Sequence, residues 1–99
     1  MNNDSKQDVI TRLKALKKEM AVRYRVKGLE LFGSVAREEH KEVSDIDILV
    51  EFEDGADLFD LVGLGLFLEE KLKRKVDVVP KRSLRAELRS SVLTEAVAI

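Results

Sequence analysis

The chain has 99 residues, of which 44% are hydrophobic and 37% are charged, and it contains no cysteine. This length suits one globular domain and not two, so we expect a single domain over residues 1–99. The lack of cysteine excludes disulfides and thiolate metal sites. The lack of a long apolar run argues against a signal peptide or a membrane span, so we expect a cytoplasmic protein.

The net charge of −1 hides a segregation of charge along the chain. Residues 6–27 contain eight Lys/Arg and two Asp/Glu, residues 38–60 contain ten Asp/Glu and one Lys, and residues 71–89 contain eight Lys/Arg and two Asp/Glu. The acidic middle could concentrate a divalent cation. The basic flanks could face nucleotide phosphates or an acidic partner, although solvated helix faces are the more common reason for such runs.

The first predicted element is a helix over residues 5–24. Ser5 fits an N-cap, Asp8 lies in the first turn, and apolar residues recur at helical spacing. A strand is predicted next, over residues 26–32, and it ends at Gly33, a residue type that tolerates backbone conformations closed to other residues.

A short helix is then predicted from Ser34, as its N-cap, to about residue 38. The charged loop that follows carries His40, the only histidine, for which we expect a solvent-exposed position. The second strand is predicted over residues 45–52 and is followed by a turn over residues 53–56.

Asp57 is predicted to cap a helix that runs to about residue 73. Its wide apolar stripe predicts a central packed helix. Gly63 and Gly65 inside it each cost roughly 1 kcal/mol of helix stability, and they could allow a close approach to a neighbouring element. The stripe consists of Leu58, Leu61, Val62, Leu64, Phe67, Leu68 and Leu72.

A third strand is predicted over residues 75–79 and is stopped by Pro80. Ser83 is predicted to cap a last helix whose apolar stripe begins at Leu84, and the apolar tail 96–99 either packs on the sheet or lies at an interface. The order α-β-α-β-α-β-α predicts an α/β (α+β) fold, a small mixed sheet flanked by helices.

Two acids open the second strand one residue apart. Side chains alternate along a strand, so Asp45 and Asp47 point to the same face, about 7 Å apart at Cα, while Ile46 and Ile48 point into the core. Two acids on one face repel each other, and a cation between them removes the conflict. Oxygen-only ligands suit Mg²⁺, and Asp77 on the third strand is the candidate for a further carboxylate.

The motif resembles that of the polymerase-beta-type nucleotidyltransferase superfamily. Gly33-Ser34 is followed, after ten intervening residues, by Asp45-x-Asp47. The longer strings at 33–37 and 44–50 resemble the minimal nucleotidyltransferases, the small partner in HEPN/MNT toxin–antitoxin pairs. The resemblance implies the nucleotidyltransferase fold.

The resemblance also implies roles for individual residues. Asp45, Asp47 and Asp77 would be catalytic and would bind two Mg²⁺ ions, with Asp77 as a potential general base. Gly33 and Ser34 would hold the β- and γ-phosphates of ATP, the substrate.

Three further positions follow from the same motif and its surroundings. Arg37 could contact the triphosphate or form an ion pair with an acid near the site, and Ser44 could orient the entrance to the second strand. Lys81 follows the third strand closely and could reach nucleotide or partner, although exposed helix charge is the more common explanation.

The acceptor is expected to be presented by another protein. The chain has only five aromatic residues and no single basic face evident from sequence, so no nucleic-acid substrate is expected. The resemblance implies transfer of AMP from ATP to a tyrosine hydroxyl of a HEPN ribonuclease toxin, and therefore a hetero-oligomer with that partner.

Two alternatives stay open at this point. The chain could be a non-catalytic antitoxin that neutralises its partner by binding alone. It could also be a nucleotidyltransferase for a small molecule, like antibiotic-modifying relatives, although these usually carry an additional helical domain.

Overall fold

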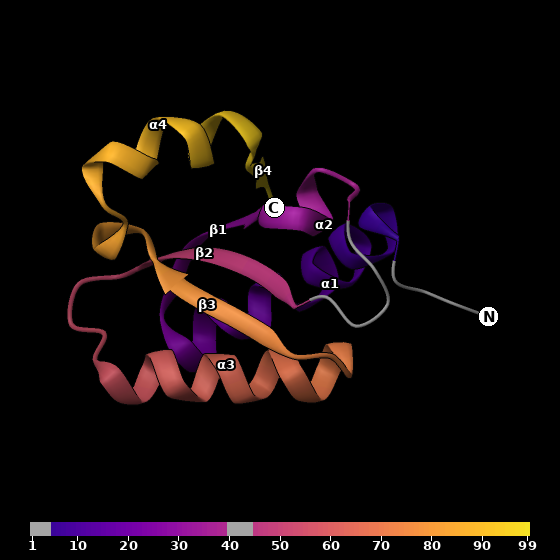
Figure 1. Ribbon diagram of the computed structural model, residues 1–99. Helices are drawn as coiled ribbons and strands as arrows, with labels where there is room; N and C mark the ends of the chain where they lie inside the picture. The colour runs from indigo at the N-terminus through magenta and orange to yellow at the C-terminus, as the bar shows by residue number, and fades with distance from the viewer. Residues whose placement is uncertain (1–4, 40–44) are drawn as a thin grey trace.

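Four strands form one mixed sheet in the order β3-β2-β1-β4 (Figure 1). The computed structural model describes residues 5–39 and 45–99. β1 pairs with β2 and with β4 in antiparallel fashion, and β2 pairs with β3 in parallel. The strands are β1 (Val26–Phe32), β2 (Ile46–Phe52), β3 (Val76–Pro80) and β4 (Val97–Ala98).

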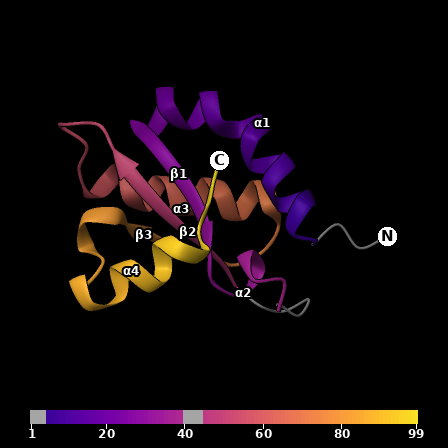
Figure 2. The ribbon, with the colours of Figure 1, turned by 90° about the horizontal axis from the view of Figure 1, so that it is seen from above.

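Helices cover both faces of this sheet, as the two views in Figures 1 and 2 show. α1 (Lys6–Tyr24) and α3 (Leu58–Leu72) lie on one face, and α4 (Ala86–Glu95) lies on the other. The short α2 (Gly33–Ala36) follows β1 directly. Across residues 5–39 and 45–99, no helix is long and apolar enough to cross a membrane. The α/β class with a small mixed sheet flanked by helices is confirmed.

Both long helices begin at the predicted caps. The Ser5 hydroxyl accepts a hydrogen bond from the backbone N–H of Asp8 at 3.1 Å. Asp57 and Asp60 form a reciprocal capping box at the start of α3, with bonds of 3.0 and 3.1 Å. These contacts satisfy backbone donors that a helix start leaves without partners, so they fix where each helix begins.

The core lies between the sheet and the pair α1/α3. Alternation along β2 directs Ile46, Ile48 and Val50 into it, each at most 1% exposed. Leu13 of α1 and Leu68 of α3 close it from the helix side and are fully buried. One face of β2 is therefore committed to packing, whereas the other face carries Asp47 and Glu51 on either side of the buried Leu49.

The last helix begins later than predicted. Ser83 ends a short 3₁₀ turn, η1 (Lys81–Ser83), and Leu84 is extended, so α4 starts at Ala86 after Arg85. The predicted cap at Ser83 is wrong because this turn and the extended residue interrupt the helical path. The apolar tail pairs with β1 as β4, so of the two alternatives it is the packing on the sheet that the structure shows.

Two strand and helix ends also differ from the sequence prediction. Pro80 does not stop β3 but belongs to it, because its position opposite Val50 in the ladder needs no N–H from the proline. α2 begins at Gly33 with Phe32 as its N-cap, one residue before the predicted start at Ser34.

The apolar stripe of α3 is wider than the face that the core covers. Leu64 and Leu68 are fully buried, as predicted, but Leu58 and Val62 turn outward and are 70% and 52% exposed. The prediction that the whole stripe is packed is therefore wrong for its outer part, because the sheet and α1 cover only one side of this helix.

Gly63 of α3 lies against the ring of Tyr24 at the end of α1. A Cβ added at Gly63 would come within 2.8 Å of Tyr24 Cε1, whereas one added at Gly65 would meet nothing closer than 3.9 Å. Tyr24 in turn packs against Phe67, with 5.4 Å between the ring centroids. The predicted close approach is thus present at Gly63 and absent at Gly65.

Alanine at these two glycines should have opposite effects on stability. Gly65→Ala should raise the free energy of unfolding by up to about 1 kcal/mol, because alanine favours the helix and its Cβ would meet only Val78 Cγ2, at an ordinary contact distance of 3.9 Å. Gly63→Ala should lower it by about 1 kcal/mol, because the clash with Tyr24 exceeds that gain. Urea unfolding of both variants checks this, and equal effects would contradict the assigned packing of α1 on α3.

Candidate active site

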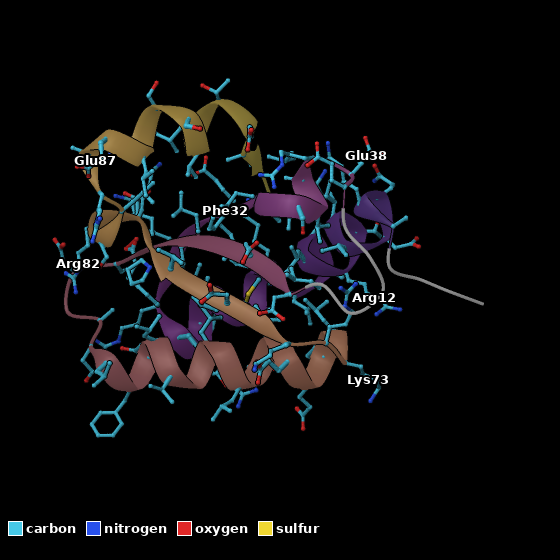
Figure 3. All side chains as sticks on the ribbon, in the orientation of Figure 1. Arg12, Phe32, Glu38, Lys73, Arg82 and Glu87 are labelled. Carbon is cyan, nitrogen blue, oxygen red and sulfur yellow. The ribbon has the colours of Figure 1, made fainter. Side chains whose placement is uncertain are left out.

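Two of the predicted acids lie side by side on the central strands. Asp47 of β2 is paired with Phe32 of β1 on one side and with Asp77 of β3 on the other. Residues paired across neighbouring strands point to the same face of the sheet. Asp47 and Asp77 therefore share one face of the sheet, and the buried Ile46 points to the other. The face that carries the two acids is the one covered by α4 (Figure 1). Figure 3 shows Phe32 on this same side.

The third predicted acid acts on Asp47 through space. Burial, followed by the carboxylates of Asp77 and then of Asp45, raises the pKa of Asp47 above its ordinary value. The guanidinium of Arg37 acts in the opposite direction. Asp45, which directly precedes β2, and Asp77 are both exposed, whereas Asp47 is half-buried. The three carboxylates thus form one cluster of negative charge that Arg37 only partly offsets.

Gly33 provides the space that Asp47 occupies. A Cβ at Gly33 would collide with Asp47 Oδ2 and would lie 2.9 Å from Asp47 Cγ. Gly33 also has a φ of +76°, a left-handed backbone conformation that costs other residues energy. Gly33 and Ser34 are both half-buried at the start of α2. The glycine-serine turn and the acid cluster are therefore direct neighbours.

The residues of the cluster suit a cation that is bound together with a substrate. Within residues 5–39 and 45–99, no group of three or more His, Cys, Asp or Glu side chains forms a ready-made metal cage. Mg²⁺ does not require one, since it is usually held by one or two carboxylates, by water and by substrate phosphates. The carboxylates crowded around Asp47 are oxygen donors of this kind, and a bound cation would relieve the repulsion among them.

Arg37 is held by carboxylates in this structure. Its Nε donates to Glu39 Oε1 and its Nη1 donates to Glu95 Oε2, both at 3.1 Å. Of the two roles considered for Arg37, ion pairing near the site is the one seen here. Glu95, at the end of α4, was not among the predicted site residues, because a contact over 58 positions leaves no signal in local spacing.

Other singled-out residues lie elsewhere or outside the described part of the chain. Lys81 pairs with Glu30 of β1 at 3.4 Å, so its contact in this structure is to an acid of the sheet. His40 and Ser44 fall outside the described residues. The structure therefore brings together Asp45, Asp47 and Asp77 with Gly33 and Ser34, and it places Arg37 at their border.

Asp47→Asn should stabilise the protein at neutral pH. The ionised carboxylate is partly buried beside two others, so its removal should raise the free energy of unfolding by up to about 1 kcal/mol, an effect limited by solvent screening. The folded-state pKa is raised, so the gain should appear as pH rises above the ordinary aspartate range and vanish at lower pH. Thermal unfolding against pH measures it, with Asp54→Asn in the exposed turn as control. A loss of stability at pH 7 would contradict the repulsion.

Gly33→Ala should destabilise the chain by about 1–3 kcal/mol, because alanine at a positive φ is strained and its Cβ displaces Asp47. Gly28→Ala in the same strand region is the matched control, since its Cβ would meet nothing closer than 3.5 Å. Urea unfolding compares the two, and equal effects would argue against the close contact of Gly33 with Asp47.

Comparisons with known proteins agree with this arrangement. The nucleotidyltransferase domain family matches residues 13–99. The protein adenylyltransferase MntA of Thermococcus cleftensis is 41% identical over 91 residues, which are 92% of each chain. The solved structure of a provisionally named minimal nucleotidyltransferase is 39% identical, covers 96% of both chains and superposes with a TM-score of 0.83.

Two solved toxin–antitoxin complexes are also similar, each at 26% identity. One was crystallised with AMP-PNP and has a TM-score of 0.70, with 86% of this chain and 70% of the matched chain covered. The other contains a tri-AMPylated HEPN toxin of Shewanella oneidensis with its MNT antitoxin, and has a TM-score of 0.67 with 94% and 70% covered. From the matched domain and these relatives, this chain belongs to the nucleotidyltransferase domain family, as one of the minimal nucleotidyltransferases.

Proposed function

We propose that this nucleotidyltransferase is the antitoxin of a HEPN/MNT pair, and that it transfers AMP from ATP to a tyrosine hydroxyl of its HEPN ribonuclease toxin with the help of Mg²⁺. The observation that carries the proposal is the in-register pairing of Asp47 with Asp77 beside the Gly33-Ser34 turn. The identity of the partner is supported by the relatives, of which one is a protein adenylyltransferase and another is crystallised with an AMPylated HEPN toxin.

The transfer replaces one bond to phosphorus by another. The tyrosine oxygen attacks the α-phosphorus of ATP, the bond from that phosphorus to the α–β bridging oxygen breaks, and pyrophosphate leaves with the electron pair. Asp77 lies at the free edge of the sheet and is exposed, so it can accept the proton of a hydroxyl that another protein presents.

Asp45 and Asp47 would hold Mg²⁺ together with Asp77. When bound, the metal supplies positive charge that stabilises the attacking and leaving oxygens; two ions are expected. Asp47 suits this role because the negative charges of Asp77 and Asp45 act on its half-buried carboxylate. A cation bound there would offset this repulsion. Without a cation, that same charge would repel the triphosphate.

Gly33, Ser34 and Arg37 would hold the triphosphate. The turn at Gly33 keeps the backbone close to Asp47, so a phosphate held by this turn would lie beside the acid cluster. Arg37 is bound to Glu39 and Glu95 in the structure. A triphosphate would therefore compete with these carboxylates for the guanidinium, which suits bidentate contacts to phosphate.

Transfer should be lost when the acids are neutralised. The chain is incubated with ATP, Mg²⁺ and the HEPN-domain toxin proposed as its partner, and AMP on the toxin is measured by intact mass. Asp45→Asn/Asp47→Asn and Asp77→Asn should each slow transfer about a hundredfold or more, whereas Asp54→Asn should not. EDTA should stop transfer and added Mg²⁺ should restore it.

Two outcomes would reject this proposal in different ways. Unchanged transfer by the double variant would remove the acid cluster from the mechanism. Full neutralisation of the toxin by that variant, without any added AMP, would favour an antitoxin that acts by binding alone.

A further inference from the structure

Glu95, the last residue of α4, reaches the arginine that borders the acid cluster. Its Oε2 accepts a hydrogen bond from Arg37 Nη1 at 3.1 Å, across 58 positions of the sequence. α4 ends beside α2, the short helix that begins at Gly33, as Figures 1 and 2 both show. A separate element of the fold therefore delivers a carboxylate to the residues proposed to hold the triphosphate.

The helix itself does not explain an acid at position 95. A carboxylate in the last turn of a helix lies at the negative end of the helix dipole, where it is unfavourable. The last turn of α4, which the structure describes in full, has no basic residue to offset that charge. It is Arg37 that supplies the positive charge beside Glu95.

Stability is also a weak explanation for this ion pair. The side chains of Arg37 and Glu95 are 40% and 39% exposed, and ion pairs with this much exposure add little to the free energy of unfolding. A ligand that needs the same guanidinium would feel the pair more directly. The pair is therefore of interest for what it does to binding at this position.

The carboxylates take up the parts of Arg37 that a phosphate would use. A guanidinium binds an oxyanion through two N–H groups on one edge, either Nε with Nη2 or Nη1 with Nη2. Glu39 occupies Nε and Glu95 occupies Nη1, so one N–H group on each edge is engaged. A triphosphate that binds Arg37 with two parallel hydrogen bonds has to displace one of these carboxylates.

The balance of charge acts in the same direction. Arg37 lies close enough to Asp47 to act on its charge. The three carboxylates of the acid cluster and the two that hold Arg37 outnumber this single guanidinium. A cation at the acid cluster would offset the three acids there, but Glu39 and Glu95 would still neutralise Arg37.

From these contacts we propose that Glu95 is a built-in competitor of ATP, which holds the guanidinium of Arg37 and so lowers the affinity of the site for the triphosphate. Glu95 acts through Arg37, so it is a positioning residue and not a catalytic one. The inference rests on the proposed function for the identity of the ligand, and it adds a residue of α4 that sets how tightly this ligand binds.

The first test measures binding of ATP with Mg²⁺ to the chain alone, by calorimetry at low salt. Glu95→Gln keeps the size of the side chain and removes its charge, so the dissociation constant should fall about threefold or more. Glu38→Gln is the matched control, because it removes the same charge from the exposed residue that follows Arg37 in the chain. It should change the constant less, and an equal effect would overturn the inference.

The second test asks whether Glu95 acts through Arg37. In an Arg37→Gln background, Glu95→Gln should improve ATP binding less than it does in the unchanged chain, because only direct repulsion of the phosphates by Glu95 is then removed. Equal improvements in both backgrounds would show repulsion alone and would overturn the inference. Thermal unfolding shows whether each variant is folded.

Kinetics separates this role from a defect in the acid cluster. In transfer of AMP to the toxin, Glu95→Gln should lower the KM for ATP at an unchanged kcat. A disturbed acid cluster would lower kcat instead, as Asp77→Asn should.

The remaining outcomes distinguish the inference from the proposed function. Unchanged ATP binding in Glu95→Gln would overturn the inference, and so would weaker binding, because Glu95 would then orient Arg37 toward the phosphates. Tighter ATP binding in this variant without any AMP on the toxin would refute the proposed function and leave the competition standing. A chain that does not bind ATP at all would refute both.

Discussion

Repulsion among the carboxylates of Asp45, Asp47 and Asp77 is the unfavourable interaction that the rest of the structure has to hold in place. The pKa of Asp47 is raised by burial and by both neighbours, so the folded chain keeps an unfavourable contact at neutral pH. It can do so because the opposite face of the same strand is fully buried, with Ile48 at 0% exposure. The apolar side of the sheet thus supplies the stability that keeps the charged side in place.

Much of this arrangement could be predicted because it is local. Alternation along a strand is enough to put Asp45 and Asp47 on one face and Ile46 on the other. The caps at Ser5 and Asp57 follow from short-range hydrogen bonds, and the structure contains both. An acid between valines at position 77 pointed to the same site from a distant part of the sequence, and its register opposite Asp47 agrees with that prediction.

What could not be predicted depends on contacts between distant segments. The ion pair of Arg37 with Glu95 requires α4 to return across the sheet, and no spacing in the sequence encodes that path. The late start of α4 at Ala86 has a similar origin, because the 3₁₀ turn after β3 overrides a stripe that otherwise has helical period. The apolar stripe of α3 is wider than its buried side, and periodicity alone does not tell which apolar residues the core covers and which stay exposed.

Holding a partner and placing its hydroxyl at the acids are different physical tasks. Affinity for a partner can come from any surface of the chain, but orientation of the acceptor hydroxyl must come from contacts near Asp77 itself. The helix on the face that carries Asp77 is α4. It has no fully buried residue, and Glu95 at its end forms an ion pair with Arg37. A triphosphate would compete with Glu95 for that same guanidinium, so the site of the phosphates and the end of α4 are linked through Arg37.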